Sequence, residues 1–252
     1  MSAFQSSSAF GNMPEVVKNL LIINGLFFLA TIALEPQGIE LSKLLGAFYW
    51  DSIHFRPWQI VTHMFMHGGF THIFFNMFAL WMFGTSIERI WGAKKFLIYY
   101  LITGFGAFVL HYAVVAFQIQ QLLPDVSPEM LEQIKENGLG YLMSNRNYTD
   151  PTFGKLNLLY NVPVVGASGA VFGILLAFGM MFPNTRLMLI FFPVPIKAKY
   201  FVIGYGAIEL FSGIANRPGD NVAHFAHLGG MLFGYFLIKY WNKNQGNSSF
   251  GY

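Results

Sequence analysis

The feature that most limits how this chain can fold is a run of 22 residues, Phe96 to Phe117, without a charged side chain. A helix needs about 20 such residues to cross the hydrocarbon layer, and only helices or closed barrels satisfy their backbone groups there. The apolar residues do not alternate with polar ones as barrel strands do. The sequence therefore predicts an all-α polytopic membrane protein.

The overall composition favours the same class of protein. Of the 252 residues, 54% are hydrophobic and 11% are charged, against about 25% charged in soluble domains. The net charge of +3 comes from scattered basic residues, so no nucleic-acid partner is expected; membrane lipid is. The chain has no cysteine, which excludes disulfides, thiolate metal sites and a cysteine nucleophile. We predict no metal and no cofactor.

The apolar segments predict a bundle of six transmembrane helices, at residues 16–34, 68–88, 95–117, 163–182, 199–216 and 223–241. The fifth is the least regular, because Pro193 and Pro195 interrupt the apolar stretch before it. The bundle forms one domain, residues 15–241. We expect disordered tails at 1–14 and 242–252.

The positive residues predict the orientation of the bundle. If the N-terminus is inside, nine of the 15 lysines and arginines fall on the inner side, as the positive-inside rule requires. Both termini are then cytoplasmic, and the long 118–160 insertion lies outside. Ser127-Pro128 predicts a helix start within the insertion. The N-terminal residues lack the pattern of a signal or targeting peptide, so we expect a bacterial inner membrane.

Four polar residues inside the predicted spans are candidates for function, because polar groups are costly in lipid. They are His72 and Asn76 in the second span, Ser168 in the fourth and His227 in the sixth. The three spans run in the same direction, and each residue lies in the first two turns. The helical rise therefore places all four within roughly 10 Å of the outer surface.

Ser168 has small neighbours in Gly166-Ala167-Ser168-Gly169, which leave its hydroxyl accessible. A helix N-terminus at this point would favour a developing negative charge. The alternative is a small-residue helix contact in which the serine bonds to its own backbone.

A glycine face accompanies His227. Gly230 and Gly234 follow it by three and seven residues, so all three share one side of the helix. Gly169 and Gly173 offer a matching surface on the fourth span, and such packing would bring the imidazole to Ser168 as a neutral base. The alternative is a histidine that only bonds a backbone carbonyl.

Two further residues of these spans are weighed. His224 is the rival base, but it is offset from the glycine face, so we prefer His227. Glu209 is an intramembrane carboxylate to which the sequence assigns no role.

His72 and Asn76 are four residues apart and share one face of the second span. An imidazole N–H and a side-chain amide can stabilise an oxyanion; a plain interhelical hydrogen bond is the alternative. Phe172, one turn after Ser168, could stack on the imidazole, although packing alone would also explain it.

These motifs together resemble the rhomboid family. His72-Ile-Phe-Phe-Asn76 is similar to its H-x-x-x-N motif, Gly166-Ala167-Ser168-Gly169 to its G-x-S-G motif, and the glycines after Ala226-His227 to its A-H-x-x-G-x-x-x-G motif. The resemblance covers about residues 14–241.

The resemblance implies an intramembrane serine endopeptidase with a Ser–His dyad and no third acid. Ser168 would be the nucleophile, His227 the general base and acid, and His72 and Asn76 the oxyanion donors. Substrates would be single-span membrane proteins cut near the outer face. The fifth helix and the loop at about 214–222 would form a gate.

The chain departs from the family pattern in three places. Trp58-Gln59 replaces the usual Trp-Arg, Phe172 stands where tyrosine is common, and the 118–160 insertion is long. Two other functions are considered: an inactive rhomboid-like protein that binds membrane clients, and a transporter with a histidine proton relay. The presence of both Ser168 and His227 argues against the first, and the lack of inverted repeats against the second.

Overall fold

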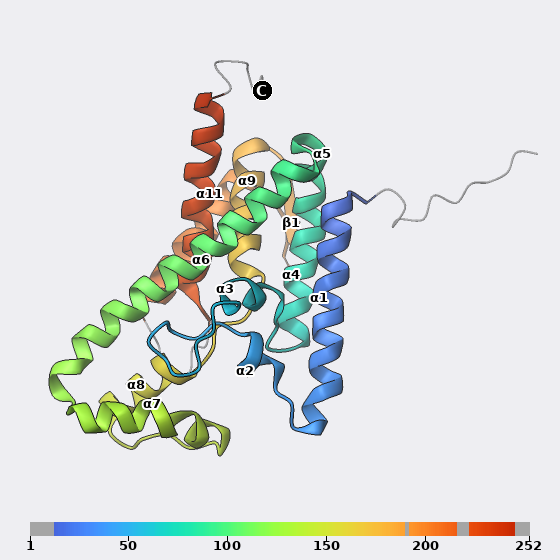
Figure 1. The fold of residues 1–252 in the computed structure, drawn as a ribbon. Coiled ribbons are helices and arrows are strands. Elements are labelled where there is room, and N and C mark those ends of the chain that lie inside the picture. The colour runs from blue at the N-terminus through green and yellow to red at the C-terminus, as the bar shows by residue number, and fades with distance from the viewer. Residues whose placement is uncertain (1–12, 190–191, 216–221, 245–252) are drawn as a thin grey trace, which may run out of the picture.

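The computed structural model describes residues 13–189, 192–215 and 222–244 (Figure 1). The long helical segments are α1 (Glu15–Leu34), α4 (Phe70–Ala79) continued by the π-helical η3 (Leu80–Gly84) and α5 (Thr85–Trp91), α6 (Ala93–Leu122), α9 (Ser168–Met181), α10 (Ala198–Ala215) and α11 (His224–Asn244). Shorter helices are η1 (Glu35–Gln37), α2 (Leu41–Leu45), α3 (Gln59–Thr62), η2 (His63–Phe65), η4 (Leu123–Asp125), α7 (Pro128–Met143) and α8 (Pro151–Asn161).

The fold is almost wholly helical, with one small departure from the all-α prediction. Strands β1 (Arg186–Leu189) and β2 (Phe192–Lys197) form an antiparallel hairpin in which Met188 pairs with Pro195. The prolines that interrupt the apolar stretch thus lie in an edge strand, where the missing N–H is tolerated. The all-α expectation therefore omits this hairpin.

Helix boundaries differ from the prediction at three places. Helix α9 begins at Ser168 rather than at 163, because the preceding residues are extended. Helix α6 continues to Leu122, into the predicted insertion. Helix α11 reaches Asn244, so residues 242–244 are helical and not part of a disordered tail. Residues 1–12 and 245–252 of the two predicted tails lie outside the described part.

Three helical stretches among the described residues are long and apolar enough to cross a membrane: Glu15–Gln37, Phe70–Trp91 and Ala93–Asp125. Helix α9 is apolar but has only 14 residues. The structure therefore supports a helical membrane protein, while the count of six spans stays a prediction. In Figure 1 the Glu15 end of α1 and the Asn244 end of α11 lie at one end of the bundle, and α7 and α8 lie at the other.

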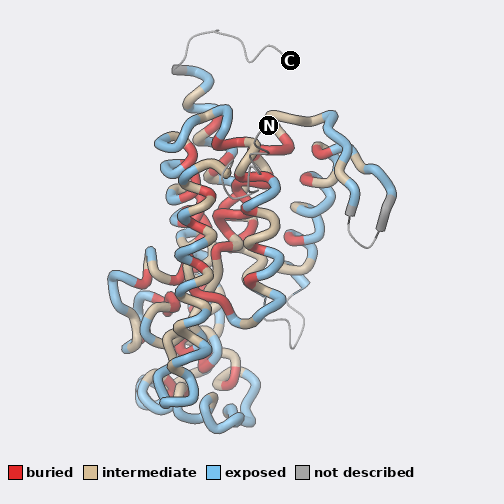
Figure 2. Tube along the Cα trace, turned by 90° about the vertical axis from the view of Figure 1, so that its right-hand side faces the viewer, coloured by how far each residue is buried: buried red, intermediate tan, exposed pale blue. Residues whose placement is uncertain are grey.

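Apolar side chains cover much of the outer surface of the bundle. On α1, Leu26 and Leu29 are 60% and 63% exposed, and on α10 Phe211 is 73% exposed. Figure 2 shows the buried residues gathered along the centre, with exposed residues facing outward. Such a surface would be unfavourable in water but matches a hydrocarbon surrounding.

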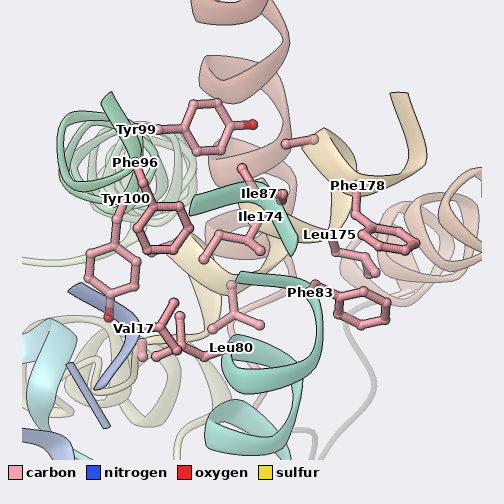
Figure 3. Packing of buried hydrophobic residues seen from close by; sticks show 14 of the residues in the cluster. Val17, Leu80, Phe83, Ile87, Phe96, Tyr99, Tyr100, Ile174, Leu175 and Phe178 are labelled. Carbon is pink, nitrogen blue, oxygen red and sulfur yellow. The ribbon is translucent and has the colours of Figure 1, made fainter. Parts of the chain in front are cut away.

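The central core is built by α6, α9 and α11 together with the segment from α4 to α5. Figure 3 shows Tyr99 and Phe96 of α6 close to Ile174 of α9, with Leu80 and Ile87 completing the cluster. All five are fully buried or nearly so. This packing fixes the spacing of the helices that carry the candidate site.

Glycines set the closest contacts, but only partly as predicted. A Cβ atom on Gly230 would overlap the main chain of Gly169, so α11 and α9 touch there. Gly234 instead faces Tyr99 of α6, whose hydroxyl donates to the carbonyl of Gly173 at 2.8 Å. The predicted glycine-to-glycine surface therefore exists at its first pair, and a tyrosine of α6 separates the second.

Glu88 anchors the start of α1. Its carboxylate accepts hydrogen bonds from the backbone N–H groups of Val16, at 2.9 Å, and Val17, at 2.8 Å. A carboxylate at this position satisfies unpaired amides and interacts favourably with the helix dipole. The side chain of Glu88 thus joins α5 to the first turn of α1.

The 118–160 insertion folds into a compact lobe of α7 and α8. Ser127 caps α7 by accepting from the Met130 N–H at 3.3 Å, and Ile134 is fully buried. Asn161 donates to the Ile134 carbonyl at 2.9 Å, and Asn157 donates to the Gly138 carbonyl at 3.2 Å. The capped helix is as Ser127-Pro128 predicts, whereas α8 has no counterpart in the prediction.

Gln59, the residue at which the sequence departs from the Trp-Arg pattern implied by the resemblance, is fully buried. Its Oε1 accepts from the Arg56 N–H at 3.0 Å, and its Nε2 donates to the His54 carbonyl at 3.2 Å. The neighbouring Trp58 indole donates to the Leu44 carbonyl at 3.1 Å. Gln59 therefore ties the loop before α3 together with a neutral side chain.

Candidate active site

The segment before Ser168 is extended and is fixed by backbone hydrogen bonds. Ala47 and Val164 exchange two backbone hydrogen bonds, of 2.9 and 2.7 Å, and the Gly166 N–H donates to the His63 carbonyl at 2.9 Å. Gly166 has φ of +134°, a conformation that residues with a Cβ rarely adopt. The backbone then turns into α9, whose first residue is Ser168. The serine hydroxyl thus lies at a helix N-terminus.

The structure brings Ser168 and His227 together from helices α9 and α11. His227 Nε2 lies 2.9 Å from Ser168 Oγ, a hydrogen-bond distance. The histidine is 8% exposed and sits one turn before Gly230, whose contact with Gly169 permits the close approach of the helices. A hydroxyl and a ring nitrogen at this distance can act as a nucleophile and its general base.

Phe172 holds the imidazole of His227 from one side. The two rings are stacked, with centroids 4.1 Å apart and planes 4° from parallel. Tyr205 of α10 contacts the same phenylalanine, with ring centroids 4.9 Å apart. The imidazole is therefore restricted to one plane beside Ser168.

A carboxylate lies on the other side of His227, and this corrects the expectation that there is no third acid. Glu209 of α10 is 5% exposed, and its Oε2 lies 2.9 Å from His227 Nδ1. The same oxygen lies 2.6 Å from His224 Nδ1. His224 therefore contacts Glu209, while His227 is the histidine that reaches Ser168.

Glu209 was missed as a site residue because sequence alone does not fix the rotation of its helix. A buried carboxylate in an apolar helix with two histidines in a neighbouring one was the available signal. Ring nitrogens and carboxylates of this kind also ligate metals, and the ligand atoms of Glu209, His224 and His227 lie within 4.8 Å of one another. The separations of 2.6 and 2.9 Å are those of hydrogen bonds between the groups.

His72 faces the serine from α4. Its Nδ1 accepts a hydrogen bond from the Gly68 N–H at 3.3 Å, which assigns the ring proton to Nε2. A Cβ atom on Gly166 would lie 2.9 Å from His72 Nε2 and 3.5 Å from Ser168 Oγ. The Nε2–H donor and the serine hydroxyl therefore flank the same glycine.

Asn76 lies one turn after His72 and is 6% exposed. Its Nδ2 has no hydrogen-bond partner among the residues that the structure describes. The amide N–H is therefore a candidate donor to a bound acceptor. His67 packs edge-to-face on His72 with centroids 5.1 Å apart, and burial first, then the nearby His72, lowers the pKa of His67 to about 4.

Of the predicted gate, the fifth helix is α10, whereas residues 216–221 of the following loop lie outside the described residues. The remaining supporting residues are placed: Gly166 between His72 and Ser168, Gly169 against α6 and α11, and Gly234 against α6. Ser168 Oγ thus has His227 Nε2 as its neighbour, and His72 Nε2 lies beside the glycine that adjoins the serine segment.

The comparisons with known proteins all indicate the same family. The model of the Rhomboid domain family matches residues 54–126 and 130–243. The chain is 29% identical over 191 residues to Rhomboid protein 1, mitochondrial, of Saccharomyces cerevisiae, which covers 74% of this chain and 44% of that protein. It is 31% identical over 180 residues to RHOMBOID-like protein 12, mitochondrial, of Arabidopsis thaliana, covering 69% and 44%.

A bacterial relative is matched over a shorter segment. Rhomboid protease GluP of Bacillus subtilis is 43% identical over 47 residues, which is 19% of this chain and 9% of that protein. The chain thus spans less than half the length of the curated relatives it matches. Because mitochondrial proteins are prominent among them, the relatives do not favour the bacterial inner membrane expected from the sequence.

Proposed function

The chain belongs to the rhomboid family, and we propose that it is an intramembrane serine endopeptidase that cleaves single-span transmembrane proteins near the outer face of the membrane. The observation that carries this proposal is the 2.9 Å contact between Ser168 Oγ and His227 Nε2. A structural serine in a small-residue helix contact has no need of a buried imidazole aimed at its oxygen.

In the proposed reaction Ser168 Oγ attacks the substrate carbonyl carbon while its proton passes to His227 Nε2. The carbonyl oxygen becomes an oxyanion, which accepts hydrogen bonds from His72 Nε2–H and Asn76 Nδ2–H. The protonated His227 then gives its proton to the leaving amine, and the peptide bond breaks. Water releases the acyl group from Ser168 with His227 as base.

The architecture proposed for this activity is a six-span bundle with both termini on the inner side. The reacting groups would then lie near the outer surface, on the side of the 118–160 insertion. The common end of α1 and α11, opposite α7 and α8, supports this arrangement (Figure 1). A transmembrane substrate is expected to enter from the surrounding lipid.

The experiment that tests the proposal is cleavage of a single-span test substrate by the full chain in proteoliposomes. Ser168→Ala should abolish cleavage, because in the proposed reaction the acyl group is carried by Ser168 Oγ. An inactive client-binding protein would cleave nothing in either form but would retain the substrate. A histidine-relay transporter would move protons equally well with and without the serine. Cleavage by the Ser168→Ala variant would overturn the proposal.

A further inference from the structure

We infer that Glu209 is a positioning residue for His227: its carboxylate fixes the tautomer of the imidazole that faces Ser168. This inference rests on the proposed protease function, in which His227 is the base. It replaces the expected two-residue system with a Ser–His–Glu arrangement, in which the carboxylate comes from the fifth long helical segment, α10.

The carboxylate contacts are specific and buried. One oxygen, Oε2, lies 2.9 Å from His227 Nδ1 and 2.6 Å from His224 Nδ1. The Glu209 side chain is 6% exposed, and those of His227 and His224 are 11% and 13% exposed. An ionised carboxylate only accepts hydrogen bonds, so both histidines meet it as N–H donors. Two charge-assisted bonds then offset part of the cost of burying the negative charge.

The tautomer follows from these contacts. With the proton of His227 on Nδ1, the lone pair is on Nε2, which is the nitrogen 2.9 Å from Ser168 Oγ. The opposite tautomer would direct an N–H at the serine and could not take its proton. Glu209 therefore selects the form of the imidazole that acts as a base.

The same carboxylate acts when the proton moves. As Ser168 attacks, its proton passes to Nε2, and His227 becomes an imidazolium beside the ionised Glu209. The positive charge is stabilised by the carboxylate, which keeps no proton itself. The Nε2 proton then goes to the leaving amine, and His227 returns to its Nδ1–H form. Phe172, stacked on the ring at 4.1 Å, contributes no charge.

His224 holds the carboxylate in place. Its contact with Oε2 is the shorter of the two, and it lies one turn nearer the start of α11. Its loss should leave Glu209 able to bind His227 but less restrained. We therefore expect a smaller effect from His224 than from Glu209.

The test compares Glu209→Gln, Glu209→Asp and His224→Ala in the purified full chain, with Ser168→Ala as the inactive control. Turnover of the transmembrane test substrate gives kcat and KM. For Glu209→Gln we expect kcat to fall about 10²- to 10⁴-fold, as when the acid of a serine protease triad becomes an amide, with little change in KM. Glu209→Asp should recover part of kcat, and His224→Ala should lose no more than about tenfold.

A second measurement reads the tautomer directly. Nitrogen-15 spectra of labelled histidine should show His227 as the Nδ1–H form in the native chain and with a substantial Nε2–H population in Glu209→Gln. A native chain in the Nε2–H form would overturn the inference even if the glutamine variant failed to fold. Unchanged kcat in Glu209→Gln would also overturn it. An inactive native chain would instead refute the proposed function, so the two failures are distinguishable.

Discussion

The two sides of Ser168 differ in how fully their polar groups are satisfied. On the α10 and α11 side, each ring nitrogen of His227 has a partner: Ser168 Oγ at 2.9 Å and Glu209 Oε2 at 2.9 Å. On the α4 side, the amide nitrogen of Asn76 has no partner within the described part of the chain. Both His227 ring nitrogens therefore contact other side chains of the site, whereas the Asn76 amide nitrogen contacts no described hydrogen-bond acceptor.

This difference distinguishes a base that is positioned in advance from a hydrogen-bond donor that acts later in the reaction. Under the proposed function, the base side is held in its working geometry before substrate binds, which lowers the reorganisation needed in the reaction. Under the same function, the Asn76 amide on the donor side hydrogen-bonds the oxyanion as it forms. That interaction is then stronger in the transition state than in the ground state.

The largest expected effect tests the complete side. His227→Ala should abolish labelling of Ser168 by a fluorophosphonate, because it removes the ring nitrogen that contacts Ser168 Oγ. His224→Ala should retain labelling at a reduced rate, since His224 touches Glu209 and not the serine. Gel fluorescence of purified variants measures both. The reverse pattern would mean that the wrong histidine has been assigned as the base.

A smaller effect tests the donor side. Asn76→Ala should cost about 2–4 kcal/mol of transition-state stabilisation, which is roughly a 30- to 900-fold loss in kcat/KM. His72→Ala should act in the same range, and the double variant should lose less than the sum if the two donors share one oxygen. Normal turnover in all three variants would remove these residues from the mechanism.

The same variant carries a stability control that sharpens the comparison. Because the Asn76 amide nitrogen makes no hydrogen bond to the described residues, its removal should lower the free energy of unfolding little beyond the lost packing. Thermal unfolding in detergent measures this. A large loss of stability in Asn76→Ala would show instead that the amide is satisfied in the resting protein.

The smallest expected effect concerns Phe172. Aromatic contacts add about 0.5–1.5 kcal/mol beyond burial, so Phe172→Leu should slow turnover about 2- to 12-fold by loosening the His227 ring. Phe172→Tyr keeps the ring and should stay within about twofold of the native rate. A leucine variant as active as the native chain would show that Glu209 alone is enough to hold the imidazole.

The sequence predicts those parts of the site that depend on spacing within one helix. The four-residue interval from His72 to Asn76 and the three-residue interval from His227 to Gly230 define shared faces, because helical geometry is fixed. The approximate positions of the long helical segments follow from apolar length. Ser127-Pro128 likewise marks the first turn of α7, since capping is a local interaction.

Features that depend on how the helices are rotated relative to one another could not be predicted from the sequence. Glu209 and His227 belong to different helices, and nothing local fixes which way the carboxylate points. The start of α9 at Ser168 depends on the pairing of Val164 with the distant Ala47. Glu88 binds the first turn of α1 across about 70 residues, which no local pattern indicates.

At the contact between Gly230 and the main chain of Gly169, no side chain lies between α11 and α9. This contact, one turn from His227, sets the separation of the helices that carry His227 and Ser168. It depends on glycine having only a hydrogen atom as its side chain. A single methyl group at that point would push the helices apart and lengthen every link between them. In this protein, the distance between His227 on α11 and Ser168 on α9 therefore depends on the missing side chain of Gly230.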